Sequence, residues 1–451
     1  MSSSPPSSTP SLVQVNGPST LTPVSPSQRV FKWRDHASLW FSLGVGLLVI
    51  QVGAYLVPAV GSRDAAVAIV LGSLLGAGLL AWTAKLGCDS GLSSAGLMHV
   101  TFGSTFARLP VLLNILQLVG WTTFELVIMR DGSTAIGRSS LGLTDAGATS
   151  KVITTLLWGG LLTLLLAGSM TQLVRRWIAR TALPLVVASL LWLSWQFISA
   201  LQPHGLATFW ARPGDGSMGL WAAVDLVIAM PISWLPLVAD YARFGQNGRS
   251  ALGGTWLGYG LANIWCYALG VLVVSGAAPG ADLVSTLLLA QGGLVALGLI
   301  LVDEIDNAYG DVYSGAVSAN SLLPSVSLRQ WSVGLGLVCT GLALVLPMHR
   351  LEPFLLLLSS VFVPLYGVIL GRWCSTDGHL RSKATVDWTA AALWLLGIGL
   401  YHALAQWSPQ WGCALPTLGV VFGLAYAYFG RFGCTACHAA DHAADHATDQ
   451  G

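Results

Sequence analysis

Three carboxylates stand within four positions of one another at the end of an apolar run, as Asp303, Glu304 and Asp306, followed by Asn307. On a helix, Asp303, Asp306 and Asn307 share one face, and Glu304 points about 100° away from it. Carboxylates this close in a medium of low dielectric constant cannot all be charged unless a cation or a shared proton compensates. The spacing therefore predicts ion or proton coupling at Asp303, Glu304 and Asp306. The alternative is a hydrated cytoplasmic vestibule.

A second set of polar residues repeats every fourth position inside another apolar run, as Gln117, Trp121 and Glu125. This spacing places all three side chains along one helix face. An indole between two hydrogen-bonding side chains suits a flat polar ring, which stacks on the indole while its edge is bonded. The pattern predicts a ligand site. The alternative is that Trp121 packs against a neighbouring helix and Glu125 reaches the outer interface.

Two further apolar runs contain polar side chains beside residues that weaken helices. Gln51 lies between several glycines and Pro58, and Ser233 and Trp234 lie between Pro231 and Pro236. Interrupted helices expose backbone groups, which a membrane tolerates only where they line a cavity. We therefore expect Gln51, Ser233, Trp234 and Asn307 to contact a substrate.

Asp225 is an ionisable residue inside the same apolar run as Trp234. A charged group in this position is costly in a membrane, which makes it a candidate substrate contact. The alternative is an interfacial carboxylate near the outer surface.

The end of the chain carries Cys434, Cys437, His438 and His442 among alanines and aspartates. Cysteine and histidine at these spacings are weak candidates for a Zn²⁺ site. The alternative is a solvated low-complexity tail, and we expect no other metal site.

The composition defines what must position these residues. Of the 451 residues, 54% are hydrophobic and only 9% are charged, whereas about a quarter are charged in an ordinary soluble domain. This excludes a cytosolic enzyme and a nucleic-acid-binding protein, and it predicts an all-α integral membrane protein embedded in the lipid bilayer. Runs of about 20 apolar residues suffice to cross the bilayer. They predict about twelve spans, at 37–60, 65–83, 110–129, 152–172, 182–201, 219–240, 251–278, 286–321, 331–348, 352–371, 387–407 and 414–430.

The distribution of positive charge predicts the orientation of these spans. With the N-terminus in the cytoplasm, 15 of the 21 Lys and Arg residues fall on the cytoplasmic side, as the positive-inside rule requires. We therefore expect a plasma-membrane (cell inner membrane) protein with both termini inside. Residues 1–30, rich in Ser, Pro and Thr, read as a disordered cytoplasmic tail, and residues 433–451 read as a second cytoplasmic tail.

The two interrupted spans, the first and the sixth, are five spans apart. Five spans per repeat would invert the second half relative to the first, which is typical of secondary transporters with a midplane site. We expect a transporter domain over 31–432, with repeat one over about 37–201, repeat two over about 219–371 and two extra helices over about 387–430.

Three stretches of the chain resemble the nucleobase–cation symporter family, at 117–121, 239–245 and 311–320. Within that family, 302–307 and 230–236 look most like the branch that transports hydroxymethylpyrimidine, a thiamine precursor. The resemblance implies a leucine-transporter-type fold with broken helices 1 and 6. It also implies that Trp121 is the aromatic platform for the base and that Glu125 is the polar contact one turn later. The family's sodium ligands lie on helices 1 and 8, with Ser or Thr hydroxyls on helix 8. This chain carries Asp306 and Asn307 in that part of helix 8 instead, so the coupling ion is H⁺ or Na⁺.

These observations predict a symporter that imports a pyrimidine-like heterocycle by alternating access, with hydroxymethylpyrimidine or a related thiamine precursor as the first candidate. The alternative is a permease of the cytosine, purine or allantoin type. A more distant alternative is an intramembrane enzyme that uses the clustered carboxylates. The histidines His36, His349 and His402 lie away from that cluster and no Gly-x-Ser-x-Gly motif is present, so we expect no enzyme and no cofactor. The sequence predicts no oligomeric state.

Overall fold

The computed structural model describes residues 20–142, 147–168, 183–202, 205–277, 283–348, 350–376 and 384–448, with side chains up to 431. The described chain is helical, apart from short irregular connections and one parallel bridge between Phe31 and Gly245. The α-helices are α1 (Trp33–Gly44), α2 (Leu47–Leu56), α3 (Ser62–Ser90), α4 (Ser94–Phe102), α5 (Arg108–Leu141), α6 (Ala148–Leu166), α8 (Leu183–Leu201), α9 (Leu206–Ala211), α10 (Leu220–Ser233), α11 (Leu235–Ala242), α12 (Gly248–Gly276), α13 (Leu283–Leu289), α14 (Gly293–Leu322), α15 (Leu328–Val345), α16 (Leu351–Ser375), α17 (Trp388–Trp407) and α18 (Ala414–Thr448).

Within the described ranges, nine helices are long and apolar enough to cross a membrane when α10 and α11 are counted as one, or ten if the bent pair α1 and α2 is also one span. The two other expected spans correspond to α14 and α18. α14 is 30 residues long but falls outside this set, because Asp303, Glu304 and Asp306 make its middle acidic. The structure thus confirms the all-helical membrane fold.

Two connections differ from the sequence prediction. The expected span 286–321 is divided into α13 and α14, and the chain turns between them at Gly292, whose φ of 73° is easiest for glycine. A short helix that we did not expect, α4, lies between the second and third spans. Its first turn is capped by Ser93, whose side chain accepts a hydrogen bond from the Gly96 amide over 3.0 Å.

The first span is broken, as predicted. α1 and α2 are separated by Val45 and Gly46 and meet at a bend of 60°. The sixth span is interrupted more mildly, at Trp234, between α10 and α11. Pro236 follows in the first turn of α11, where a missing backbone N–H costs little.

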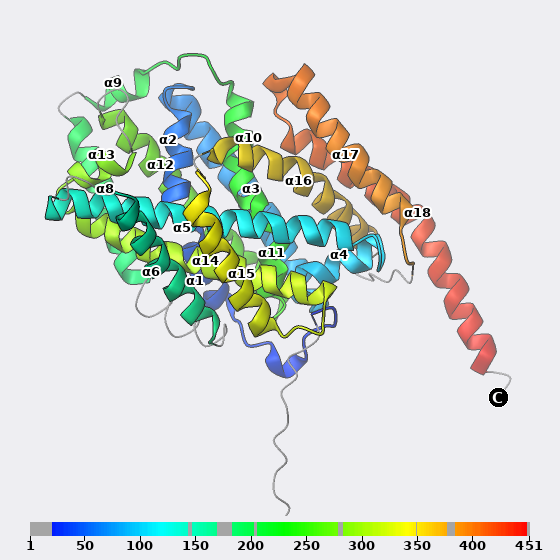
Figure 1. Cartoon of the computed structure of the whole chain (residues 1–451). Helices are drawn as coiled ribbons and strands as arrows, with labels where there is room; N and C mark the ends of the chain where they lie inside the picture. The colour runs from blue at the N-terminus through cyan, green and yellow to red at the C-terminus, as the bar shows by residue number, and fades with distance from the viewer. Residues whose placement is uncertain are drawn as a thin grey trace, which may run out of the picture.

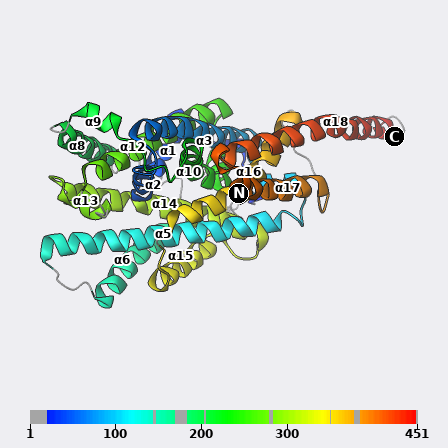
Figure 2. The ribbon, with the colours of Figure 1, turned by 90° about the horizontal axis from the view of Figure 1, so that it is seen from above.

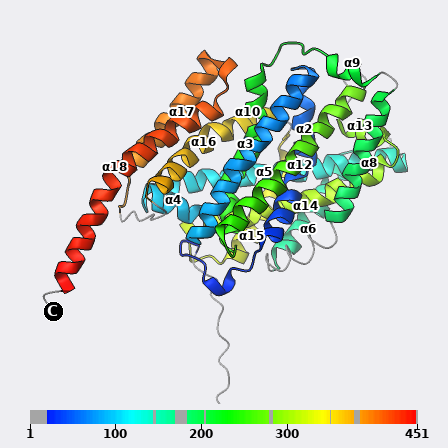
Figure 3. The same ribbon diagram turned by 180° about the vertical axis from the view of Figure 1, so that it is seen from behind.

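Helices from the second half of the chain pack against helices from the first half. α12 packs against α1, α2 and α3, and α14 packs against α5. In Figure 2, α5 runs along one side of the molecule, with α14 on its inner side and α6 and α15 on its outer side. Figures 1 and 3 show α16, α17 and α18 together at one end, where α18 extends beyond the other helices.

The segment before α1 ties the ends of several helices together. The Thr20 hydroxyl donates to the Asn320 side chain over 3.2 Å, and the Arg29 guanidinium donates to the Cys88 carbonyl over 3.1 Å. The Phe31 amide donates to the Phe244 carbonyl over 2.9 Å. Residues 20–32 therefore link the ends of α3, α11 and α14 on the N-terminal side of the molecule.

Candidate functional site

A narrow cavity lies at the break between α1 and α2. In this conformation it is nearly closed, because the space that a water molecule can enter is only about 20 Å³. α5 contributes Trp121 and Glu125, and α14 contributes Glu304 and Asn307. Trp234, at the interruption of the sixth span, also lines it. The remaining lining residues are Leu43, Gly46, Leu48, Val49 and Met230.

Glu304 and Asn307 hold the broken first span against α14. The Leu47 amide, at the start of α2, donates to the Glu304 carboxylate. The Asn307 side-chain amide donates to the Val45 carbonyl and to the Glu304 carboxylate, both over 3.2 Å. A carboxylate at a helix N-terminus accepts from an otherwise unpaired backbone donor and is favoured by the helix dipole. The charge of Glu304 is thus partly compensated by α2.

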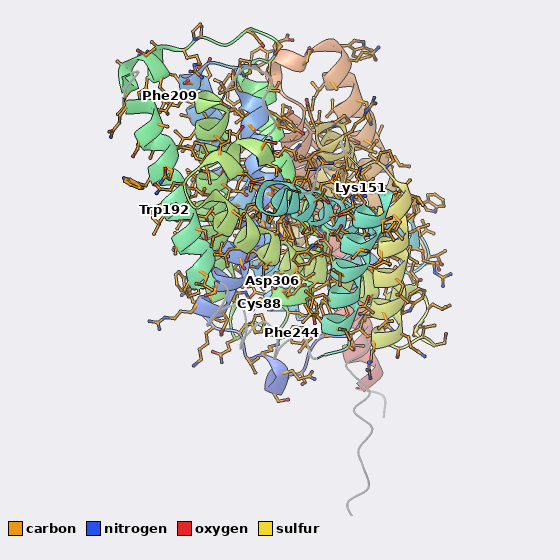
Figure 4. The ribbon with its side chains drawn as sticks, turned by 60° about the vertical axis from the view of Figure 1, so that its left-hand side comes forward. Cys88, Lys151, Trp192, Phe209, Phe244 and Asp306 are labelled. Carbon is orange, nitrogen blue, oxygen red and sulfur yellow. The ribbon has the colours of Figure 1, made fainter. Side chains whose placement is uncertain are left out.

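Asp303 and Asp306 lie on a different side of α14 from Glu304. The Ser42 hydroxyl of α1 is 3.1 Å from Asp303 Oδ1 and 3.5 Å from Asp306 Oδ2. Both carboxylates are buried, and Asp303 Oδ2 has no hydrogen-bond partner. Figure 4 shows Asp306 in the interior of the molecule, whereas Trp192 points outward. Glu304 is therefore separated from Asp303 and Asp306, as the helix spacing predicts, but Asn307 lies with Glu304 at the cavity while Asp303 and Asp306 face α1.

Some polar residues of α5 bond to the interrupted sixth span, and others line the cavity. The Gln117 side-chain amide donates to the Ser233 carbonyl over 3.1 Å and to the Asn114 side chain over 2.9 Å. Asn114 in turn donates to the Pro236 carbonyl over 3.0 Å. These bonds join α5 to the residues on both sides of the interruption at Trp234. Gln117 and Asn114 therefore support the broken sixth span, and Gln117 is not among the cavity-lining residues.

Trp121 and Glu125 are the α5 residues that reach the cavity. The Trp121 ring lies 5.2 Å from the Phe354 ring, nearly edge to face. Both side chains are buried, and Glu125 is only 2% exposed. Even so, Trp121 Nε1 and Glu125 Oε2 have no hydrogen-bond partner in the described structure. Buried polar groups in proteins are nearly always paired. Both atoms are therefore free to bond a ligand.

Besides Gln117, three predicted substrate contacts lie elsewhere. The Gln51 side chain donates to the Tyr55 hydroxyl over 2.7 Å. The Ser233 hydroxyl donates to the Met230 carbonyl over 2.7 Å. Asp225 accepts from the Cys413 amide and, over 3.2 Å, from the Ala414 amide at the start of α18. None of the three lines the cavity.

Asp311 is a buried carboxylate that the sequence reasoning did not single out as a site residue. It lies on α14 one turn after Asn307 and interacts electrostatically with Glu125. Asp311 follows Asn307 by four residues and Glu304 by seven, so the helix period alone places it on their face of α14.

The weak metal candidates Cys434, Cys437, His438 and His442 have side chains outside the described residues, although the backbone of α18 continues through them. Among the described side chains, no group of three or more His, Cys, Asp or Glu residues could hold a metal ion.

A bundle of apolar helices, with a buried polar cavity beside a broken span, defines a multi-pass membrane transport protein. Residues 23–429 match the family model described as permease for cytosine/purines, uracil, thiamine, allantoin. The chain belongs to this family, and it is therefore a permease and not an enzyme.

Known proteins agree with this assignment. The chain is 27% identical to the cytosine permease of Escherichia coli (strain K12) over 406 residues, which cover 87% of this chain and 86% of that one. A purine-uracil permease of Arabidopsis thaliana is 34% identical over 106 residues, 23% of this chain and 18% of that one.

Solved structures share the fold. Mhp1, a nucleobase-cation-symport-1 family transporter solved in a closed conformation with bromovinylhydantoin bound, superposes with a TM-score of 0.74. Its sequence is 16% identical, and the match covers 93% of this chain and 96% of that one. A Na⁺-coupled sialic acid symporter superposes with a TM-score of 0.60 at 11% identity, covering 90% of each chain. The leucine-transporter-type fold implied by the resemblance is thereby confirmed.

Proposed function

We propose that this permease is a symporter that imports a pyrimidine-like heterocycle, with hydroxymethylpyrimidine or a related thiamine precursor as the first candidate. The observation that carries the proposal is that the side chains of Trp121, Trp234, Glu125, Glu304 and Asn307 line one cavity, and so combine aromatic rings with polar groups. A flat ring stacks on indole, and an exocyclic amine donates to carboxylates.

Cytosine is the second candidate, because the similarity to the Escherichia coli cytosine permease extends over most of both chains. Purified protein in liposomes should be supplied with labelled hydroxymethylpyrimidine and labelled cytosine in separate experiments. We expect concentrative uptake of the first, with the label recovered chemically unchanged. Preferential uptake of cytosine would replace the first candidate by the second, and absence of uptake of any tested base would contradict the proposal.

The coupling ion is proposed to act at Asp303 and Asp306. Their carboxylates face the Ser42 hydroxyl of α1, which is the helix that must move relative to α14 if the broken span opens and closes. A buried pair of carboxylates retains a proton or binds a cation, because two uncompensated charges are too costly in low dielectric. Either event would change the attraction between α1 and α14.

We expect proton coupling to dominate over sodium coupling, because carboxylates occupy the part of α14 where hydroxyl ligands were expected. Uptake in proteoliposomes should persist when external sodium is replaced by choline at constant pH, and it should change when the pH gradient is collapsed at constant sodium. Complete loss of accumulation in choline would show that sodium is the coupling ion.

The proposed location is the plasma membrane, with both termini in the cytoplasm. It is supported by the excess of Lys and Arg on the side that carries the N-terminus. Fusion of a reporter that is active only in the cytoplasm to each end of the chain tests it.

A further inference from the structure

The charge of the cavity suggests the charge of its ligand. Two carboxylates, Glu125 and Glu304, line it, and no lysine, arginine or histidine of the described chain does. The two carboxylates differ in their surroundings. Glu304 already accepts from the Leu47 amide and from Asn307. Glu125 Oε2 has no partner, although the residue is buried.

The other titratable groups near Glu125 do not compensate its charge. Glu304 and Asp311 reach it from α14, and Cys339 reaches it from α15. All of these are acids, so their interaction with an ionised Glu125 is repulsive or absent. Met230 and Trp234, from the sixth span, and Leu48 and Val49, from α2, complete the lining without a titratable group. A buried carboxylate in such surroundings is stable as an anion only if a cation joins it.

The remaining unpaired atoms fit a small aromatic cation. Asn307 Oδ1 is a second buried acceptor without a partner, and the Trp121 indole lines the same cavity. A cation over an indole face is attracted by the ring quadrupole. A hydrogen bond from a charged donor to a carboxylate is about twice as strong as one between neutral groups. A flat ring that carries a positive charge and an amino group can use the Glu125 carboxylate, the Asn307 oxygen and the Trp121 indole at once.

We propose that the ligand binds as a cation, namely an aminopyrimidine or similar heterocycle protonated on a ring nitrogen, whose exocyclic amino group donates to Glu125. This inference rests on the proposed function and narrows its substrate class. It separates this cavity from one that selects a neutral base. It also means that each transported ligand carries one proton with it, in addition to any proton held at Asp303 and Asp306.

The test compares three probes of similar shape: 4-aminopyrimidine, which can be protonated; 4-amino-1-methylpyrimidinium, which is always a cation; and pyrimidin-4-one, which is neutral and has no amino group. Binding to the full chain in detergent or nanodiscs is followed by tryptophan fluorescence and calorimetry from pH 5 to 8. We expect the permanent cation to bind at neutral pH at least tenfold more tightly than pyrimidin-4-one. We also expect the affinity for 4-aminopyrimidine to approach that of the permanent cation as the pH falls toward the ring nitrogen's own pKa.

The variant Glu125→Gln should weaken binding of the permanent cation at least tenfold and leave binding of pyrimidin-4-one within about twofold. Glu125→Asp keeps the charge, and we expect it to retain a preference for the cation even if its affinity is lower. If Glu125→Gln does not fold, the three-probe comparison on the parent still decides the question.

Equal affinity for pyrimidin-4-one and the permanent cation at every pH, or equal losses of both in Glu125→Gln, would overturn the inference. In either case a neutral ring still binds, so the proposed transport function stands. If none of the probes, cytosine or hydroxymethylpyrimidine binds or is taken up, the proposed function itself fails.

Discussion

At the residue scale, Trp121 combines burial with an unpaired indole N–H and a place on the cavity wall. We expect Trp121→Ala to weaken ligand binding by about 1–3 kcal/mol, the range found when an aromatic platform for a base is removed. The measurement is equilibrium binding of the transported base. Trp388→Ala is the matched control, because that side chain is 74% exposed and far from the cavity lining. Unchanged affinity in Trp121→Ala would make Trp121 a packing residue for Phe354.

The acidic residues of α14 should separate into two groups when each is changed to its amide. Glu304 lines the cavity and caps α2, so Glu304→Gln should mainly lower ligand affinity. Asp303 and Asp306 face Ser42, so Asp303→Asn and Asp306→Asn should mainly change the dependence of uptake on pH. The reason is that interacting carboxylates titrate as one unit, and removing one of them alters the titration of the other.

Initial uptake rates against pH, together with equilibrium binding, measure both effects. Asp64→Asn, on an exposed first turn of α3, is the control. An unchanged pH profile in Asp303→Asn and Asp306→Asn would mean that the pair carries no coupling ion. Loss of affinity in these two variants without loss in Glu304→Gln would mean that they, and not Glu304, contact the ligand.

Much of this site could be predicted from spacing alone. The repeat of four placed Trp121 and Glu125 on one face, and both line the cavity. Spacing alone could not predict how α14 is rotated about its axis, and therefore which of its carboxylates faces the cavity. This rotation depends on the bond between Glu304 and the Leu47 amide, which joins residues 257 positions apart. The surroundings of Asp225 could not be predicted for a similar reason, because its partners at the start of α18 are distant in sequence.

At the element scale, the broken first span requires α2 and α12 to approach closely. A Cβ atom on Gly53 would lie 2.7 Å from the Cα of Tyr267, and one on Gly270 would lie 2.8 Å from the Ala54 nitrogen. The neighbours in both cases are backbone atoms, which cannot rotate away. These glycines therefore set the distance between α2 and α12, and through it the position of the cavity wall.

We expect Gly53→Ala to lower the stability of the protein by about 1–3 kcal/mol, the usual cost of overpacking. Alanine has the better helix propensity, by at most about 1 kcal/mol, so the clash should decide the sign. Thermal unfolding of the purified protein is the measurement. Gly298→Ala, on α14, meets nothing within 4 Å and should be neutral or slightly stabilising. A Gly53→Ala protein as stable as the parent would show that α2 can shift without cost.

The sequence located the apolar elements well and the short ones poorly. Long apolar runs must be helical in a bilayer because every backbone group has to be paired within the segment. That constraint does not apply to α4 and α13, which are only nine and seven residues long. Their positions depend on caps, on the turn at Gly292 and on packing against the long helices, and none of these produces a strong hydropathy signal.

At the scale of the whole molecule, helices from both proposed repeats line the cavity, whereas α17 and α18 lie at one end of the molecule (Figures 1 and 3). α18 packs mainly on α16, which the sequence assigns to the proposed second repeat. Its first turn is additionally joined to α10, the first half of the interrupted sixth span, through Asp225. This contact connects the added helices to the part of the molecule that alternating access would move.

Asp225 should therefore matter for stability and not for ligand affinity. Its carboxylate accepts from the Cys413 and Ala414 amides, which have no partner within their own helix, and a cap of this kind contributes about 0.5–2 kcal/mol. We expect Asp225→Ala to lower the thermal unfolding temperature and to leave the dissociation constant of the transported base unchanged. Asp225→Asn keeps one acceptor oxygen and should lose less. Asp215→Ala is the control, because Asp215 accepts from the Ser217 amide in an exposed connection where water can replace it. A selective loss of affinity in Asp225→Ala, with unchanged stability, would return Asp225 to the substrate contacts that the sequence alone suggested.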